Sequence, residues 1–302
     1  MSSNTTIEYP KKTREIYNHF FNSKHWDNFK PRDGDLIIVP WAKSGTTWVQ
    51  QITAQLVFNG SEDYDLHAMS PWLECRPFPI EHILAGLEAQ EHQRFIKCHL
   101  PVDALGLNPK LKYICIVRDG RDAIWSYYNH LNRMNDDLYG ILNSNIEPDW
   151  PIVEKPRDGA HKFFNEWMEN DAKTFTSYFD HIKSWWNVRH LPNVKVLHFN
   201  DLKKDLKGEI LKIADFLGIE KDGLNIDTIV EHCTFDYMKS NANKLVLGGD
   251  ESWQGGAHNF MNKGVNGQWK EALTPAEKEN YEKIALERLG AECANWAATG
   301  EL

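Results

Sequence analysis

The sequence is poor in cysteine and has no closely spaced cysteine pair. Its 302 residues contain only Cys75, Cys98, Cys115, Cys233 and Cys293. An odd number of scattered cysteines is typical of reduced thiols in an intracellular protein rather than of a disulfide framework. The chain also lacks the His, Cys and acidic spacings of metal sites, so we expect no metal.

Long apolar runs and an excess of basic residues are absent as well. No run approaches the roughly 20 apolar residues that span a bilayer, and the N-terminal segment MSSNTTIEYPKKTREIYNHF lacks the apolar core of a signal peptide. A net charge of −9 argues against the basic face that nucleic acids require. We therefore expect a cytoplasmic protein that binds neither membranes nor nucleic acid, while a local basic pocket for a small anion stays compatible with this charge.

Short apolar runs alternate with segments of helical periodicity. The predicted buried strands are DLIIVP (35–40), KYICIVRD (112–119) and VKVLHF (194–199). The predicted helices cover residues 47–58, 121–131, 208–218 and 275–290. This alternation predicts an α/β fold in which helices flank a mostly parallel sheet, as a single domain over residues 1–302. The polar stretches 132–160 and 240–268 are predicted to be loops, which in compact domains often bind ligands.

The segment WAKSGTTWVQQ (41–51) is nearly a phosphate-binding loop. The Walker pattern places Lys after its second Gly, whereas Lys43 precedes the only glycine, Gly45. In open α/β sheets ligands bind beyond the carboxyl ends of the strands, where this segment lies. An oxyanion there would accept from the next helix's amides and from the hydroxyls of Ser44, Thr46 and Thr47. The alternative is an ordinary strand–turn–helix junction with capping hydroxyls.

Two later stretches supply further anion-binding groups. In VRDGRDAIWS, Arg118 ends a predicted strand and Ser126 lies two turns into the following helix. The planar guanidinium suits a phosphate, although Arg118 could instead form a surface salt bridge with Asp119 or Asp122. In FMNKGVNGQWK (260–270), Lys263 and Gly264 could close over an anion or belong to a flexible surface loop.

Five motifs together resemble the cytosolic sulfotransferases, from about residue 35 to 285. They are KSGTTW, RDGRDAIWSYY, KGVNGQWK, KCHLP (97–101) and HFNDLKKDLKGEI (198–210). The resemblance implies a P-loop-like sulfotransferase fold with 3′-phosphoadenosine 5′-phosphosulfate (PAPS) as donor and adenosine 3′,5′-bisphosphate (PAP) as product. The implied reaction is in-line sulfonate transfer, without a metal, to a hydroxyl or amine of a small-molecule acceptor.

The resemblance also implies roles for individual residues. His99 would be the general base, because its titration near neutrality suits proton removal from an acceptor hydroxyl. Lys43 would assist the departing 5′-phosphate and Lys97 would support charge near the transferring sulfonate. The implied donor ligands are Ser44, Gly45, Thr46 and Thr47 for the 5′-phosphate; Arg118, Ser126, Lys263 and Gly264 for the 3′-phosphate; and Trp48, Phe199, Phe235 and Met238 near the adenine.

The sequence departs from the family pattern at three places. Phe199 stands where relatives usually carry Tyr, and Asn262 stands where they carry Arg, so one cation against the 3′-phosphate is missing. The family's short dimer motif keeps Lys270, Thr274 and Glu279 but is interrupted by Pro275. A homodimer is therefore compatible with the sequence but not secured by it.

The acceptor is the least determined part of the interpretation. Trp72, Phe78, Tyr127 and Tyr139 are candidate walls for a phenol or hydrophobic alcohol, with core packing as the alternative. Asp136 and Asp137 border the acceptor site by resemblance and could pair with a cationic amine, or could simply be solvated. Two other functions stay open: a non-catalytic protein that binds PAP or PAPS, and a P-loop phosphotransferase, whose Lys position and Mg²⁺-holding Asp are not evident.

Overall fold

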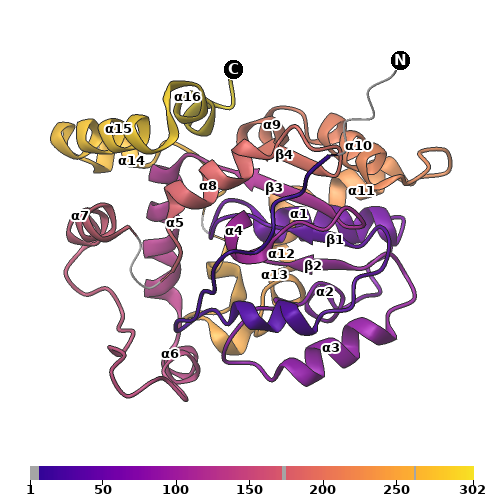
Figure 1. Cartoon of the computed structure of the whole chain (residues 1–302), viewed down its shortest axis with the longest axis horizontal. Coiled ribbons are helices and arrows are strands. Elements are labelled where there is room, and N and C mark those ends of the chain that lie inside the picture. The colour runs from indigo at the N-terminus through magenta and orange to yellow at the C-terminus, as the bar shows by residue number, and fades with distance from the viewer. Residues whose placement is uncertain (1–6, 172–174, 262) are drawn as a thin grey trace.

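A four-stranded parallel sheet forms the centre of the computed structural model, which describes residues 7–171, 175–261 and 263–302 (Figure 1). Its strands, in the order β2-β1-β3-β4, are β1 (Leu36–Ile38), β2 (Phe95–Lys97), β3 (Lys112–Val117) and β4 (Val194–His198). Every neighbouring pair is parallel, with Ile37 opposite both Ile96 and Tyr113. Parallel pairing directs the carboxyl ends of all four strands to one edge of the sheet.

Helices connect the strands and cover both faces of the sheet (Figure 1). Their bounds are η1 (Ser23–Asn28), α1 (Thr46–Val57), α2 (Leu66–Met69), α3 (Ile80–Ala89), α4 (Val102–Leu105), α5 (Gly120–Arg133), α6 (Asp136–Leu142), α7 (Ala160–Asn170), α8 (Tyr178–Asn187), α9 (Phe199–Lys204), α10 (Leu206–Leu217), α11 (Ile226–His232), α12 (Phe235–Ser240), α13 (Ala242–Leu245), η2 (Gly249–Ser252), η3 (Ala257–Asn259), α14 (Trp269–Ala272), α15 (Pro275–Leu289) and α16 (Ala291–Thr299).

Alternate strand residues belong to different hydrophobic clusters on the two faces of the sheet. On one face, Ile37 and Cys115 pack with buried residues of α5, α8, α15 and α16. On the other face, Ile38 and Ile114 pack with buried residues of α1, α10 and α11. Because both faces are covered, the strands read as continuous apolar runs rather than as alternating patterns.

The predicted α/β class is confirmed, and each of the three predicted strands and four predicted helices is found with its ends shifted by a few residues. The three-residue strand β2 was not predicted, because so short a run carries little pattern. The prediction of loops was wrong in part. Helix α6 interrupts 132–160, where the Asn135 side chain caps its first turn by accepting from the Leu138 N–H at 3.0 Å. Short helices α13, η2 and η3 interrupt 240–268.

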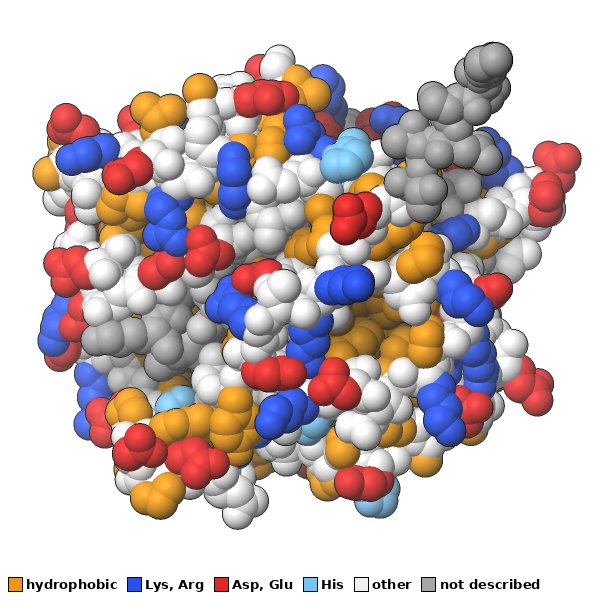
Figure 2. All heavy atoms as spheres, viewed as in Figure 1, with side chains coloured by type: hydrophobic (Ala, Val, Ile, Leu, Met, Phe, Trp, Pro, Cys, Tyr) orange, Lys and Arg blue, Asp and Glu red, His pale blue; other side chains and the backbone are white. Residues whose placement is uncertain are grey.

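The surface and the side chains of the described residues show three further features. Acidic and basic side chains are interspersed over the face shown in Figure 2, so no single-sign patch dominates that view. Within residues 7–171, 175–261 and 263–302, no helix is both long and apolar enough to cross a bilayer. The same ranges contain no group of three or more His, Cys, Asp or Glu side chains arranged to hold a metal ion.

Candidate active site at the carboxyl edge of the sheet

A cavity of about 470 Å³ lies where the four strands end. Arg118 and Phe199, which directly follow β3 and β4, line it together with Lys97, the last residue of β2, and the turn after β1 from Ala42 onward, as the parallel topology predicts. Among the charged side chains that line it, one is acidic, Asp122, and five are basic: Lys43, Lys97, Arg118, Lys203 and Lys263. A chain with a net charge of −9 thus gathers positive charge in one cavity, which favours an anionic ligand.

The turn between β1 and α1 forms a tight cradle at one end of the cavity. Lys43 and Gly45 both have left-handed backbone conformations, with φ of 62° and 117°. A Cβ at Gly45 would lie 2.9 Å from Ile116 Cδ1, so only glycine lets the backbone pass here. The buried Ser44 Oγ has no hydrogen-bond partner among the described residues. An unpaired hydroxyl beside the N-terminal amides of a helix of 12 residues fits a phosphate.

Lys43 places its ammonium group in an enclosed and largely apolar part of the cavity. Its Nζ lies 3.3 Å from Nδ1 of His130 and 3.8 Å from the centre of the Phe260 ring. Burial lowers the pKa of Lys43 to about 7, and the positive charges of Lys97 and Arg118 act in the same direction. An arriving phosphate would supply the missing counter-charge and favour the protonated amine.

His99 lines the same cavity and is held as a neutral imidazole. Its Nδ1 lies 2.6 Å from the carbonyl oxygen of Pro40, which can only accept, so Nδ1 carries the proton and Nε2 keeps its lone pair. Burial lowers the pKa of His99 well below its usual range, and the nearby Lys97 adds to this effect. Glu74 accepts a hydrogen bond from the His99 backbone N–H at 2.6 Å. The residue is therefore oriented as a proton acceptor.

Arg118 is buried, and its guanidinium group is tied into the site rather than to a surface acid. Nε donates to Asn266 Oδ1 at 2.8 Å, and Nη2 donates to the Val265 carbonyl at 3.1 Å. Of the two salt-bridge partners considered from the sequence, Asp119 pairs with Arg121 at 2.9 Å, and Asp122 accepts from the Gly267 N–H at 2.8 Å. Burial lowers the pKa of Arg118. The guanidinium group nevertheless stays protonated at neutral pH.

Aromatic rings form another part of the cavity wall. Trp48 donates from Nε1 to the Cys233 carbonyl at 2.8 Å, and its ring meets Phe199 edge to face at 5.2 Å between ring centres. Gly264 packs so closely on Phe235 that a Cβ would lie 2.6 Å from the ring. These flat apolar surfaces suit a planar base.

The cavity brings together most of the residues singled out in the sequence. Those that line it are Lys43, Gly45, Thr46, Thr47, Trp48, Trp72, Lys97, His99, Arg118, Ser126, Tyr127, Phe199, Phe235, Met238, Lys263 and Gly264. Ser44 is fully buried and is not among the residues that line the cavity, and Asn262 falls outside the described residues.

Four residues expected at the acceptor wall lie elsewhere. Phe78 is 37% exposed, and the Tyr139 hydroxyl donates to the Leu131 carbonyl at 2.8 Å within the core. Asp136 and Asp137 are exposed in the first turn of α6, whose N-terminus favours acids there. None of the four lines the cavity, so the prediction that they do is corrected.

Sequence reasoning also missed several lining residues. They are Phe20, Asp122, His130, Phe175, Lys203 and Phe260, together with smaller contributions around them. Phe20 and Phe175 come from segments without a recognisable motif, so only the fold identifies them. Lys203 and His130 could have been predicted, because each lies four residues after a motif residue on the same helix face. Lys203 follows Phe199, and His130 follows Ser126.

Comparison with known proteins agrees with this geometry. The sulfotransferase domain family matches residues 33–291. The chain is 32% identical over 316 aligned positions to a glycolipid sulfotransferase of Mycobacterium bovis (strain BCG / Pasteur 1173P2), with 97% of each chain covered. It is 30% identical to human sulfotransferase 1E1, with 93% of this chain and 94% of the relative covered. A solved structure of a mouse sulfotransferase complexed with PAP shares the fold, with a TM-score of 0.67, 23% identity and 90% of each chain covered. The chain therefore belongs to the sulfotransferase family.

Proposed function

We propose that this sulfotransferase uses PAPS as donor, releases PAP, and transfers the sulfonate group to a hydroxyl of a small apolar acceptor. The observation that carries the proposal is the excess of basic over acidic side chains in one cavity of an acidic protein. Family membership supplies the reaction class, and the residues below supply the means to carry it out.

The residues of the cavity fit the two phosphates of the donor. The cradle around Gly45, with the unpaired Ser44 hydroxyl, suits the 5′-phosphate. Arg118, with Ser126 and the segment around Lys263, suits the 3′-phosphate. The rings of Trp48 and Phe235 would hold the adenine between these groups, and Phe199 and Met238 would close the same end.

PAPS supplies an activated sulfonate, and the protein's own groups would handle the proton and the charge. His99 Nε2 would accept the proton of the acceptor hydroxyl as the new bond between oxygen and sulfur forms. Lys43 would donate to the phosphate oxygen from which the sulfonate departs, and Lys97 would stabilise negative charge on the transferring group. The step needs positioning and charge stabilisation more than covalent chemistry, as in phosphoryl transfer.

The acceptor end is apolar and aromatic. Trp72 and Phe175 contact the His99 ring, Phe260 lies against Lys43, and Phe20 and Tyr127 line the same cavity against Phe175. Apart from Asp122, which accepts from the Gly267 N–H at 2.8 Å on the donor side, no described acidic residue lines the cavity. These walls support a phenol or hydrophobic alcohol rather than a cationic amine.

Three further properties belong to the same proposal. Both core clusters share one sheet, which supports a single domain over residues 1–302. The scattered, buried, unpaired cysteines support a cytoplasmic location. A homodimer through Lys270, Thr274 and Glu279 stays a prediction, and the Thr274 side chain already caps α15 within its own chain.

The test is detection of sulfonated product by mass spectrometry. The protein is incubated with PAPS and a panel of phenols, sterols, aliphatic alcohols and cationic amines, without added metal. We expect product on neutral aromatic or apolar acceptors. PAP binding without any product would instead favour a non-catalytic binding protein, and failure to bind PAP would contradict the proposal.

A further inference from the structure

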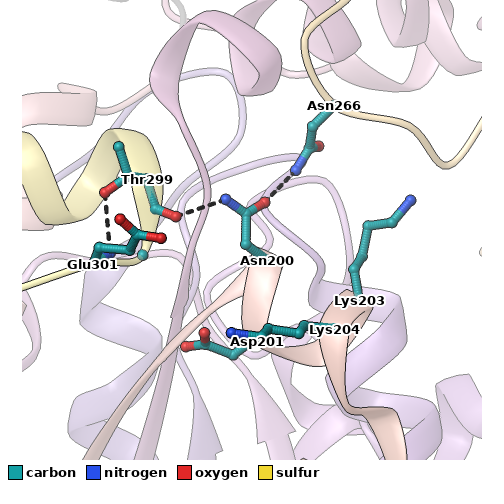
Figure 3. A pocket seen from close by; sticks show the side chains of 8 residues that line it. Asn200, Asp201, Lys203, Lys204, Asn266, Thr299 and Glu301 are labelled. Carbon is teal, nitrogen blue, oxygen red and sulfur yellow. Dashed lines mark hydrogen bonds between the residues drawn. The ribbon is translucent and has the colours of Figure 1, made fainter.

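A chain of hydrogen bonds runs from Arg118 through the protein to its C-terminal helix. Arg118 Nε donates to Asn266 Oδ1 at 2.8 Å, and Asn266 Nδ2 donates to Asn200 Oδ1 at 2.7 Å. Asn200 Nδ2 then donates to the carbonyl oxygen of Thr299 at 2.8 Å. Figure 3 shows the last two links side by side, with Asn200 of α9 between the segment that carries Asn266 and the end of α16.

The direction of this chain is fixed by chemistry. A guanidinium group can only donate, and a backbone carbonyl can only accept. Both amides between Arg118 and Thr299 must therefore present oxygen toward the guanidinium and nitrogen toward the carbonyl. Reversing either amide would place two donors or two acceptors against each other, so each link holds its neighbour in one orientation.

Lys203 provides a second connection to the same segment, which we call the donor loop (residues 263–268). Its Nζ donates to the Gly264 carbonyl at 2.6 Å, and its side chain lines the donor cavity. Lys203 also borders a second cavity of about 420 Å³ with Asn200, Asn266 and Thr299, so it stands between the donor site and the hydrogen-bond chain (Figure 3).

The described hydrogen bonds use three of the five N–H groups of Arg118, since Nη1 also donates to the Lys43 carbonyl at 3.3 Å. The remaining donors are available to a ligand. Their direction depends on the plane of the guanidinium group, which the bond from Nε to Asn266 sets.

We propose that Asn200 is a positioning residue that, through Asn266, aims Arg118 at the donor's 3′-phosphate, while Lys203 holds the donor loop beside it. The inference rests on the proposed function, because it assigns these residues to the donor site. In this proposal, α9 supports recognition of the 3′-phosphate through Asn200 and Lys203, two residues that were not singled out in the sequence.

The test compares PAP with adenosine 5′-monophosphate, which lacks the 3′-phosphate. In the full-length protein, Asn200→Ala and Lys203→Met should each weaken PAP binding about tenfold, the scale of a lost hydrogen bond to a charged group. Binding of the monophosphate should change less than about twofold. The KM for PAPS should rise by the same factor as the PAP dissociation constant, with kcat nearly unchanged.

Three matched variants sharpen the comparison. Lys203→Arg keeps a donor toward Gly264 and should restore PAP affinity. Lys204→Met, at the next and exposed position of α9, should leave both affinities unchanged. The double variant Asn200→Ala/Asn266→Ala should be no weaker than Asn266→Ala alone, because the two residues act in one chain.

Two results would overturn the inference: PAP affinity that stays at the wild-type value in Asn200→Ala and Lys203→Met, or equal losses for PAP and the monophosphate. The second result would assign these residues to general stability. If the wild-type protein binds no PAP at all, the proposed function fails first, and the two failures are therefore distinguishable.

Discussion

Nζ of Lys43 lies 3.3 Å from Nδ1 of His130, and the two groups meet in a pocket that Phe260 closes. A neutral imidazole nitrogen can accept from an ammonium group but cannot balance its charge. Burial also lowers the pKa of His130 well below its usual range, so the imidazole is neutral at physiological pH. The pair thus holds Lys43 in place without neutralising it, which leaves the charge to be matched by the donor.

The binding of PAP should therefore take up a proton. The pKa of Lys43 is lowered to about 7 in the free protein, and a bound phosphate favours the ammonium form. Below pH 7 the amine is already charged, so affinity is nearly constant. Above pH 7 the binding of each PAP molecule requires Lys43 to take up a proton from solvent, and the affinity for PAP should fall by up to tenfold per pH unit.

Calorimetry in two buffers of different ionisation enthalpy measures this uptake directly. We expect close to one proton at pH 8 to 9 for the wild type and almost none for Lys43→Arg. Burial raises the pKa of Asp122 to about 6, so this carboxyl titrates below the pH window of the experiment. Burial also lowers the pKa of Lys97. Uptake that persists in Lys43→Arg would therefore point to Lys97.

Replacement of His99 should separate chemistry from donor binding. His99→Ala removes the only described imidazole whose Nδ1 is bonded to Pro40, and loss of a general base costs about 10²- to 10⁴-fold in rate. The ring lies against Trp72 and Phe175 on the acceptor side, so PAP affinity should change little. Product formation at the wild-type rate in this variant would remove His99 from the mechanism.

The sequence predicts the residues of one half of the site better than those of the other half. The donor half comes from short contiguous motifs: the cradle around Gly45 and the segment that starts with Arg118 were identified because their residue types and order follow from phosphate binding. The half that we propose for the acceptor is built from rings such as Phe20, Phe175 and Phe260, contributed by distant segments. Each of these rings alone is indistinguishable from a core residue, so only the folded chain reveals them.

Glu74 illustrates a residue that no local pattern identifies. Its carboxylate is buried and accepts from the Trp72 and Trp26 indoles at 2.7 and 3.0 Å and from the His99 backbone at 2.6 Å. Burial raises its pKa. The sequence around it contains no motif, because its partners Trp26 in η1 and His99 just after β2 are brought to it only by the fold.

Glu74→Gln should destabilise the protein by about 1 to 3 kcal/mol, because an amide nitrogen would then face an indole or backbone N–H and leave a buried donor unpaired. Urea denaturation measures the change in the free energy of unfolding. Glu91→Gln, at an exposed position, should alter it by less than about 0.5 kcal/mol. Equal stability of Glu74→Gln and the wild type would show that the carboxylate does not need all three donors.

The glycine of the cradle should be intolerant of any side chain. Gly45→Ala places a Cβ 2.9 Å from Ile116 Cδ1 and 3.3 Å from the Phe199 ring at a φ of 117°. The strained backbone costs about 1 to 3 kcal/mol, and widening of the turn should weaken PAP binding as well. Thermal unfolding and PAP titration measure the two effects.

Gly86→Ala is the matched control for this substitution. Gly86 lies within α3, and a Cβ there would meet nothing within 4 Å. Alanine is favoured over glycine in a helix by about 1 kcal/mol, so this variant should be slightly more stable than the wild type and bind PAP equally well. A Gly45→Ala protein that behaves like Gly86→Ala would contradict the steric account of the cradle.

The acids at the start of α6 should have no part in acceptor choice. Asp136 and Asp137 are exposed and do not line the cavity, so Asp136→Asn/Asp137→Asn should leave the ratio of kcat/KM for cationic and neutral acceptors unchanged. A loss of at most about 1 kcal/mol per charge in stability is expected, because acids favour a helix N-terminus. The measurement is competition between a phenol and an aromatic amine in one reaction, with both products quantified by mass spectrometry. A selective loss of the amine product would mean that α6 approaches the acceptor during turnover, and the cationic class would then replace the apolar one.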